Sequence, residues 1–199
     1  MTGKEWIQTA HAAKEAGTVW LCVTGGEPLV HPDFPEIWKE LTQMGFFITL
    51  QTNASLIQGD MADLLAEYPP RAVKITLYGS NDEVYEQVCR VKDGFSRVDR
   101  GIRTLRELKI PVQLISTVIR QNLEDVPRMA YYAYQNRLPW MATGGVKATV
   151  RNPDSQARMV RVEEKLGQQK KEEIRYRLEK VPVNIERKPC TYCKDYRLG

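Results

Sequence analysis

The sequence predicts an α/β fold in which strands and helices alternate around a parallel sheet. Short apolar or β-branched runs follow one another along the chain. They are separated by stretches whose apolar residues recur at helical spacing. This alternation is typical of repeated strand–helix units, which wind in one direction because parallel crossovers are right-handed. Five such units make an open sheet or part of a barrel.

The first half of the chain supplies three of these units. Trp6, Ile7, Ala10 and Ala13 lie at helical spacing, and Gly17 can end that helix. An apolar run over residues 19–23 is typical of a short buried parallel strand. A helix is then expected over residues 34–44, a second strand over 46–50, a short helix around Leu64, and a third strand over 72–77.

The second half continues the pattern and then changes. Helices are expected over residues 81–88, 95–108 and 123–135, with a fourth strand over 112–118 and a fifth over 146–150. Residues 155–180 are strongly charged with sparse apolar positions, which favours a solvated helix packed on the domain. A helix that binds a partner protein is the alternative.

Composition limits the classes of protein to consider. A chain of 199 residues is long enough for one domain with a sizeable core. The net charge of +4 does not call for a nucleic-acid partner. The sequence has no apolar run long enough to span a membrane and no apolar signal-peptide core at its start. These features, and four cysteines better suited to free thiols or metal ligands than to disulfides, predict a cytoplasmic protein.

The stretch Val23-Thr24-Gly25-Gly26-Glu27-Pro28 is the first candidate site. Two glycines allow a sharp turn and a close approach of the backbone to a ligand. Glu27 adds a carboxylate at the carboxyl end of a parallel strand, where α/β barrels keep their ligand sites. We therefore expect Glu27 to capture an ammonium group while peptide groups hold the rest of a small polar ligand. The alternative is an ordinary turn with an exposed glutamate.

This stretch and several later ones resemble the radical S-adenosylmethionine (SAM) enzymes. Gly25-Gly26-Glu27-Pro28 resembles the motif that binds the methionyl amino group of SAM. Further similarity lies at Leu50-Gln51-Thr52-Asn53, Lys74-Ile75-Thr76-Leu77-Tyr78-Gly79-Ser80, Val91-Lys92-Asp93-Gly94-Phe95, Gly101-Ile102, Thr117-Val118 and Asn122. The order of these motifs is similar to that of the subgroup with a SPASM-type C-terminal extension, over about residues 5–151.

The resemblance implies a partial (β/α)6 TIM-like barrel whose first βα unit is missing. It divides the chain into a truncated core (1–151), a linker with a charged helix (152–189) and the start of an auxiliary-cluster extension (190–199). The family binds its [4Fe–4S] cluster through a C-x-x-x-C-x-x-C loop ahead of the GGEP motif, and this sequence contains no such loop. We therefore interpret the chain as a fragment or a shortened relative of a radical SAM enzyme, inactive by itself.

The resemblance also implies a set of SAM-binding residues at the strand ends. These are Gly25, Gly26, Glu27, Pro28, Thr52, Asn53, Ser80, Thr117 and Asn122. For two of them the residue type also fits a structural role. Asn53 is a good turn former, and Asn122 can cap the helix expected from residue 123.

Cys190 and Cys193 have the two-residue spacing that lets both thiolates reach one metal ion. In the subgroup that the chain resembles, a cysteine at this place begins the ligand set of an auxiliary cluster, and incidental thiols are the alternative. Cys22 and Cys89 are expected in the core. The two histidines, His11 and His31, have no catalytic partner in the sequence.

The function implied by the resemblance is that of a radical SAM oxidoreductase or maturase. In such enzymes SAM is cleaved reductively at the cluster, and the resulting radical abstracts hydrogen from a substrate, commonly a peptide or protein. An electron donor is a further partner of the intact enzyme. A SAM- or peptide-binding module without chemistry is one alternative, and a phosphate-binding barrel enzyme is another. An uncovered strand edge predicts self-association, for example as a homodimer.

Overall fold

The computed structural model describes residues 1–144, 168, 169 and 172. Five strands form one sheet in the order β1-β2-β3-β4-β5, and every neighbouring pair is parallel. The strands are β1 (Trp20–Val23), β2 (Phe47–Thr52), β3 (Ala72–Thr76), β4 (Val112–Thr117) and β5 (Trp140–Thr143). Strands that follow one another in the chain are therefore neighbours in the sheet, as repeated βα units require.

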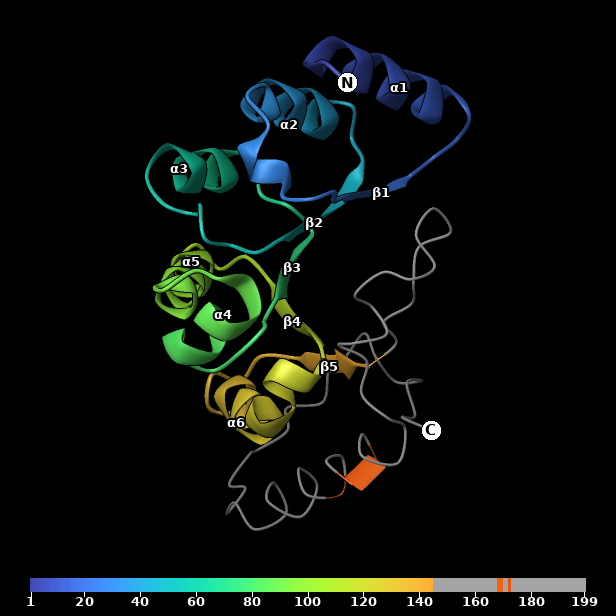
Figure 1. Ribbon diagram of the computed structural model, residues 1–199. Coiled ribbons are helices and arrows are strands. Elements are labelled where there is room, and N and C mark those ends of the chain that lie inside the picture. Colours follow the sequence, from blue (N-terminus) through green and yellow to red (C-terminus); the bar gives the residue numbers. More distant parts are fainter. Residues whose placement is uncertain (145–167, 170–171, 173–199) are drawn as a thin grey trace.

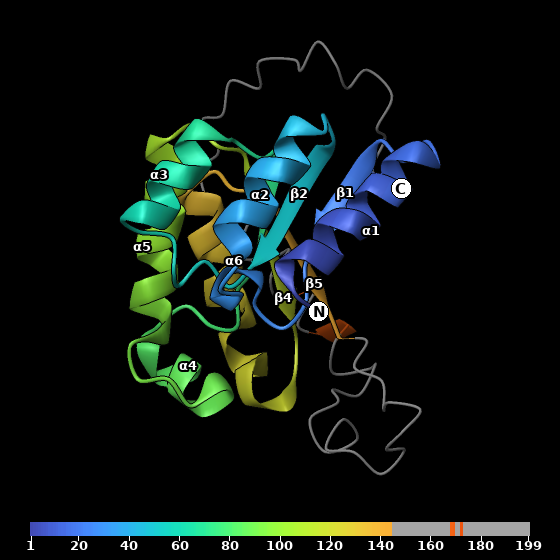
Figure 2. The same cartoon turned by 90° about the horizontal axis from the view of Figure 1, so that it is seen from above.

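The helices lie along one side of a curved sheet (Figure 1). They are α1 (Gly3–Glu15), α2 (Phe34–Gln43), α3 (Asp60–Glu67), α4 (Asp82–Cys89), α5 (Gly94–Glu107) and α6 (Val126–Gln135), with the short 3-10 helices η1 (Pro28–Val30) and η2 (Arg120–Asp125). Figure 2 shows the arrowhead of β2 directed toward the edge of the sheet where η1 lies. The predicted α/β fold with part of a barrel is confirmed.

The two faces of the sheet differ in composition and burial. Alternate residues of the three central strands face the helices and are almost fully buried: Ile48, Leu50, Val73, Ile75, Val112 and Leu114. The residues between them point to the inner, concave face and are only half-buried, including Thr49, Gln51, Lys74 and Gln113. The core therefore lies between sheet and helices, and the inner face is mostly polar.

Two expectations from the sequence need correction, and a third falls outside the described residues. Cys22 is exposed, because it lies on the inner face of β1, where no described element covers it. The helix expected from residue 123 begins later: η2 comes first, and α6 starts at Val126 with a proline in its first turn. The fifth strand of the described sheet is β5, four residues long, and the strand expected over residues 146–150 lies outside the described residues.

The boundaries proposed after residue 144 stay predictions, because most of that segment lies outside the described residues. Residues 168, 169 and 172 are helical, within the charged stretch for which a helix is predicted. Cys190 and Cys193 belong to the part that is not described. Among the described residues, no helix combines the length and the apolar character that crossing a membrane requires.

Asn122 of η2 ties together the ends of two strands. Its side-chain amide donates to the carbonyl oxygens of Tyr78 (3.0 Å) and Thr117 (3.1 Å), and its oxygen accepts from the N–H of Ile119 (2.8 Å). The side chain is fully buried. Asn122 thus satisfies three backbone groups at the carboxyl edge of β3 and β4.

We expect Asn122→Ala to lower the free energy of unfolding by roughly 1–3 kcal/mol, because it leaves buried backbone groups without partners. Urea denaturation of the two proteins measures this difference. Asn136→Ala is the control: Asn136 lies half-buried at the end of α6, its NH2 group donates to the carbonyl of Tyr132 in the same helix, and its oxygen accepts from the exposed Arg106. Equal midpoints for the Asn122→Ala protein and the wild type would contradict the assigned role.

Candidate functional site

The loop after β1 presents bare backbone at the carboxyl edge of the sheet. Gly25 has a φ of +153°, a conformation that side-chain-bearing residues rarely adopt. A Cβ added at Gly25 or Gly26 would meet nothing within 4 Å, so space is open beside both residues. The peptide groups of this loop are therefore accessible to a ligand, as the sequence predicts.

Glu27 follows this loop and is held by its own backbone and by the next strand. Its Oε1 accepts from the N–H of Leu29 (3.2 Å), so Glu27 caps η1. The Thr52 hydroxyl donates to Oε1 (2.6 Å), and the N–H of Asn53 donates to Oε2 (2.7 Å). The carboxylate of Glu27 therefore bridges the first loop and the end of β2, and its orientation is fixed by three donors.

These contacts leave capacity for one more donor. A carboxylate has about four acceptor positions, and the three described donors occupy two on Oε1 and one on Oε2. All three donors are neutral, and within the described part of the chain no cation pairs with Glu27. The site thus holds an oriented negative charge with one free position on Oε2, which suits an ammonium group.

Thr52 and Asn53 contribute to this site in different ways. Thr52 is 3% exposed, and its hydroxyl both donates to Glu27 and accepts from the N–H of Ala54 (3.0 Å). The hydroxyl proton is therefore committed to Glu27, which makes Thr52 a support for that carboxylate, and its predicted contact with SAM stays a prediction. Asn53 is half-buried, and its side-chain oxygen accepts from the N–H of Ser55 (2.8 Å), as in a turn. The NH2 group of Asn53 has no partner among the described residues.

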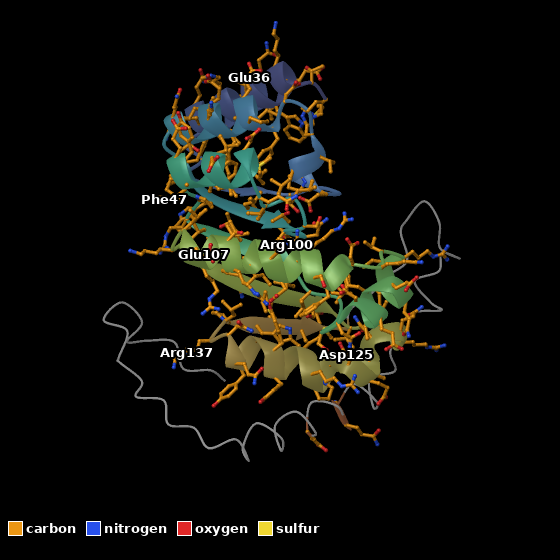
Figure 3. All side chains as sticks on the ribbon, turned by 90° about the vertical axis from the view of Figure 1, so that its left-hand side faces the viewer. Glu36, Phe47, Arg100, Glu107, Asp125 and Arg137 are labelled. Atoms are coloured by element: carbon orange, nitrogen blue, oxygen red, sulfur yellow. The ribbon has the colours of Figure 1, made fainter. Side chains whose placement is uncertain are left out.

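Ser80 is held by a residue that sequence analysis did not single out. Its N–H and hydroxyl donate to the two carboxylate oxygens of Asp125 at 2.6 and 2.8 Å. Asp125 is 3% exposed and lies in η2, which packs against α4 (Figure 3). Its place just before the Val126-Pro127 start of α6 marks a helix boundary, but nothing in the sequence indicates its contact with Ser80.

The remaining predicted residues are distributed along the same edge. Thr117 ends β4 on the inner face, half-buried, and its hydroxyl has no partner in the described part. Pro28 is the first residue of η1. Asn122 is buried and its side chain is hydrogen-bonded to three backbone groups, while its predicted contact with SAM stays a prediction. The structure thus gathers Gly25, Gly26 and Glu27 with Thr52 and Asn53, and ties Ser80 to η2.

The described cysteines do not form a metal site. Cys22 lies exposed on β1, and Cys89 lies half-buried at the end of α4, where burial raises the pKa of its thiol. Among residues 1–144 and the three described helical residues beyond them, no three histidine, cysteine or acidic side chains come together. The described residues therefore do not fit a [4Fe–4S] cluster, which needs several thiolates.

Comparison with known proteins supports the assignment made from the motifs. The family model of the radical SAM superfamily matches residues 1–133. The chain is 31% identical over 108 residues to an AdoMet-dependent heme synthase of Methanosarcina barkeri, covering 54% of this chain and 31% of that protein. It is 25% identical over 126 residues to a PqqA peptide cyclase of Granulibacter bethesdensis, covering 63% of this chain and 34% of that protein. The chain spans about a third of the length of these relatives.

Solved structures with the same fold include SAM-bound enzymes. SuiB of Streptococcus suis bound to S-adenosylmethionine superposes with a TM-score of 0.67 at 16% identity, covering 89% of this chain and 40% of that one. The enzyme anSMEcpe with bound AdoMet gives 0.59 at 18% identity, covering 76% and 46%. These likenesses show the fold. Because the family model covers more than half of its residues, the chain belongs to the radical SAM superfamily.

Proposed function

We propose that this chain carries the SAM-binding part of a radical SAM enzyme. The observation that supports the proposal most is the oriented carboxylate of Glu27, with one free acceptor position beside accessible glycine backbone. SAM carries an ammonium group that matches this position. In this role Glu27 binds and orients, and it neither gives nor takes a proton.

The other residues have supporting roles in the proposal. Thr52 positions the carboxylate of Glu27 through its hydroxyl. Gly25 and Gly26 provide peptide groups, and the free NH2 of Asn53 and the hydroxyl of Thr117 are open to the polar parts of SAM. Ser80 and Asn122 hold the backbone that follows β3 in place, because their side chains are hydrogen-bonded to protein groups. The superfamily uses SAM as the source of the radical that starts its reactions.

For the intact enzyme we propose hydrogen abstraction from a peptide substrate. The support is the name of a relative, a PqqA peptide cyclase, and the structure of SuiB bound to the precursor peptide SuiA. An AdoMet-dependent heme synthase is also among the relatives. The proposal that the substrate is a peptide is therefore more specific than the proposal of SAM binding. An electron donor and an auxiliary cluster at Cys190 and Cys193 complete the proposed enzyme.

A second candidate is a SAM-binding module that performs no chemistry by itself. It is favoured by a feature of the sequence: the 199 residues contain no C-x-x-x-C-x-x-C loop, and the described cysteines lie apart. The two candidates share the SAM site and differ only in the cluster, so iron binding distinguishes them.

We expect Glu27→Gln to weaken SAM binding about tenfold or more, because a charge-assisted hydrogen bond to the ammonium becomes a neutral one. Isothermal titration calorimetry with SAM measures the dissociation constant. Glu36→Gln is the matched control, since Glu36 is exposed on the outer helix α2 (Figure 3). Unchanged affinity in the Glu27→Gln protein would refute the proposed contact.

Thr52→Val tests whether orientation of the carboxylate matters. The substitution keeps the shape of the side chain and removes the hydroxyl that donates to Glu27, so we expect SAM affinity to fall roughly threefold to tenfold. Thr104→Val serves as control, because the Thr104 hydroxyl bonds only the carbonyl of Arg100 in its own helix. If both variants bind SAM as tightly as the wild type, Thr52 does not position Glu27 for binding.

Anaerobic reconstitution with iron and sulfide separates the two candidates. We expect the chain alone to bind SAM but to show no cluster whose electron paramagnetic resonance spectrum changes when SAM is added, since no described residues fit such a cluster. Iron and sulfide content are measured on the same samples. A cluster that responds to SAM would instead show that this chain contains a complete SAM-ligating cluster site.

A further inference from the structure

Three long polar residues lie side by side in the middle of the inner face of the sheet. The register pairs Gln51 of β2 with Lys74 of β3, and Lys74 with Gln113 of β4. All three are half-buried, and they alternate with residues that face the helices and are buried. The concave side of the curved sheet therefore carries a row of two amides with a cation between them.

The side chains of this row have no partner within the described part of the chain. No hydrogen bond or ion pair involves the amide of Gln51, the ammonium of Lys74 or the amide of Gln113. Buried polar groups elsewhere behave differently: Thr52, Ser116, Asn122 and Asp125 are all hydrogen-bonded. Because the three residues are only half-buried, their polar groups face the concave side of the sheet and are available to a ligand there.

Lys74 is also the only charged residue in the five described strands. The strand interiors of α/β barrels are usually filled with bulky apolar side chains, so a lone cation there is unusual. A half-buried ammonium in such a position favours an anionic group that replaces part of its lost hydration. The flanking amides can donate to the same anion.

Lys74 lies slightly deeper in the sheet than the residues that hold Glu27. Glu27 and the glycines belong to a loop beyond the end of β1, and Glu27 bonds residues at the end of β2. The register places Lys74 beside Gln51, the residue before Thr52, so its Cα lies one residue, or about 3 Å, further inside the sheet than that of Thr52. Lys74 therefore lies next to the proposed SAM site, and the SAM affinity of Lys74 variants shows whether the two sites are separate.

We propose that Lys74, flanked by Gln51 and Gln113, binds a carboxylate of the substrate on the concave face of the sheet. This inference rests on the proposed function, and it names the substrate class as one that carries a carboxylate. In a peptide the carboxylate is either an acidic side chain or the C-terminus, and both present the same two oxygens to the row.

Three small probes distinguish the two sources of carboxylate. N-acetyl-glutamate N-methylamide carries a side-chain carboxylate, N-acetyl-glutamine carries a terminal one, and N-acetyl-glutamine N-methylamide carries none. Binding is followed by NMR in the presence of SAM, through the methyl group of Ile115 on the inner face and that of the buried Ile48 on the helix face. We expect at least one carboxylate probe to shift the signal of Ile115 and bind about tenfold tighter than the neutral probe.

The variants assign this preference to Lys74. Lys74→Gln should abolish the preference for carboxylate, Lys74→Arg should keep it, and Lys4→Gln, on the exposed face of α1, should leave it unchanged. SAM affinity is measured for the wild type and for these three variants. If Lys74→Gln weakens SAM binding as much as Glu27→Gln does, the carboxylate is that of SAM and the proposal is overturned. It is also overturned if no probe binds, or if Lys74→Gln retains the preference.

These measurements keep the two proposals apart. Normal SAM binding without a carboxylate preference overturns the inference about Lys74 and leaves the proposed SAM site standing. A carboxylate preference that depends on Lys74, with no SAM binding, contradicts the proposed SAM site and leaves the anion site standing.

Discussion

The site depends on one contact between consecutive βα units. The carboxylate of Glu27, in the loop after β1, accepts hydrogen bonds from Thr52 and Asn53 at the end of β2. Because β1 and β2 are parallel neighbours, their carboxyl ends meet at one edge, and a single side chain can join them. The contact orients a negative charge beside accessible glycine backbone. Without it, the N–H of Leu29 would be the remaining described donor to the carboxylate, and nothing described would hold Glu27 to the end of β2.

The same device recurs at the next pair of strands. Asn122 joins the carboxyl ends of β3 and β4, and Asp125 holds Ser80 in the loop that follows β3. Both residues are buried and come from η2, which packs against α4. The carboxyl edge is thus fixed by buried polar side chains with satisfied hydrogen bonds, a rigid support for a binding site. The inner-face row around Lys74 differs, because its polar groups have no described partner.

Sequence pattern predicts the elements better than the contacts between them. Strands β2, β3 and β4 are evident from apolar and β-branched runs, and the glycines before Glu27 mark the loop. Trp140–Thr143 is short and follows Pro139, so its pattern is too brief to indicate β5. The buried roles of Thr52 and Asn122 depend on partners 25 and 44 residues away in the chain, which no local pattern reveals. Cys22 is exposed although the sequence predicts it in the core, because an apolar run does not show which face of a strand is covered.

The central claim is that Glu27 receives the ammonium group of SAM. The most direct measurement is an experimental structure of this chain in complex with SAM. The account predicts the amino nitrogen of SAM within about 2.7–3.2 Å of Oε2 of Glu27, with the bonds to Thr52 and Asn53 retained. A complex in which the amino group lies elsewhere, or in which Glu27 leaves Thr52 to meet the ligand, would contradict it.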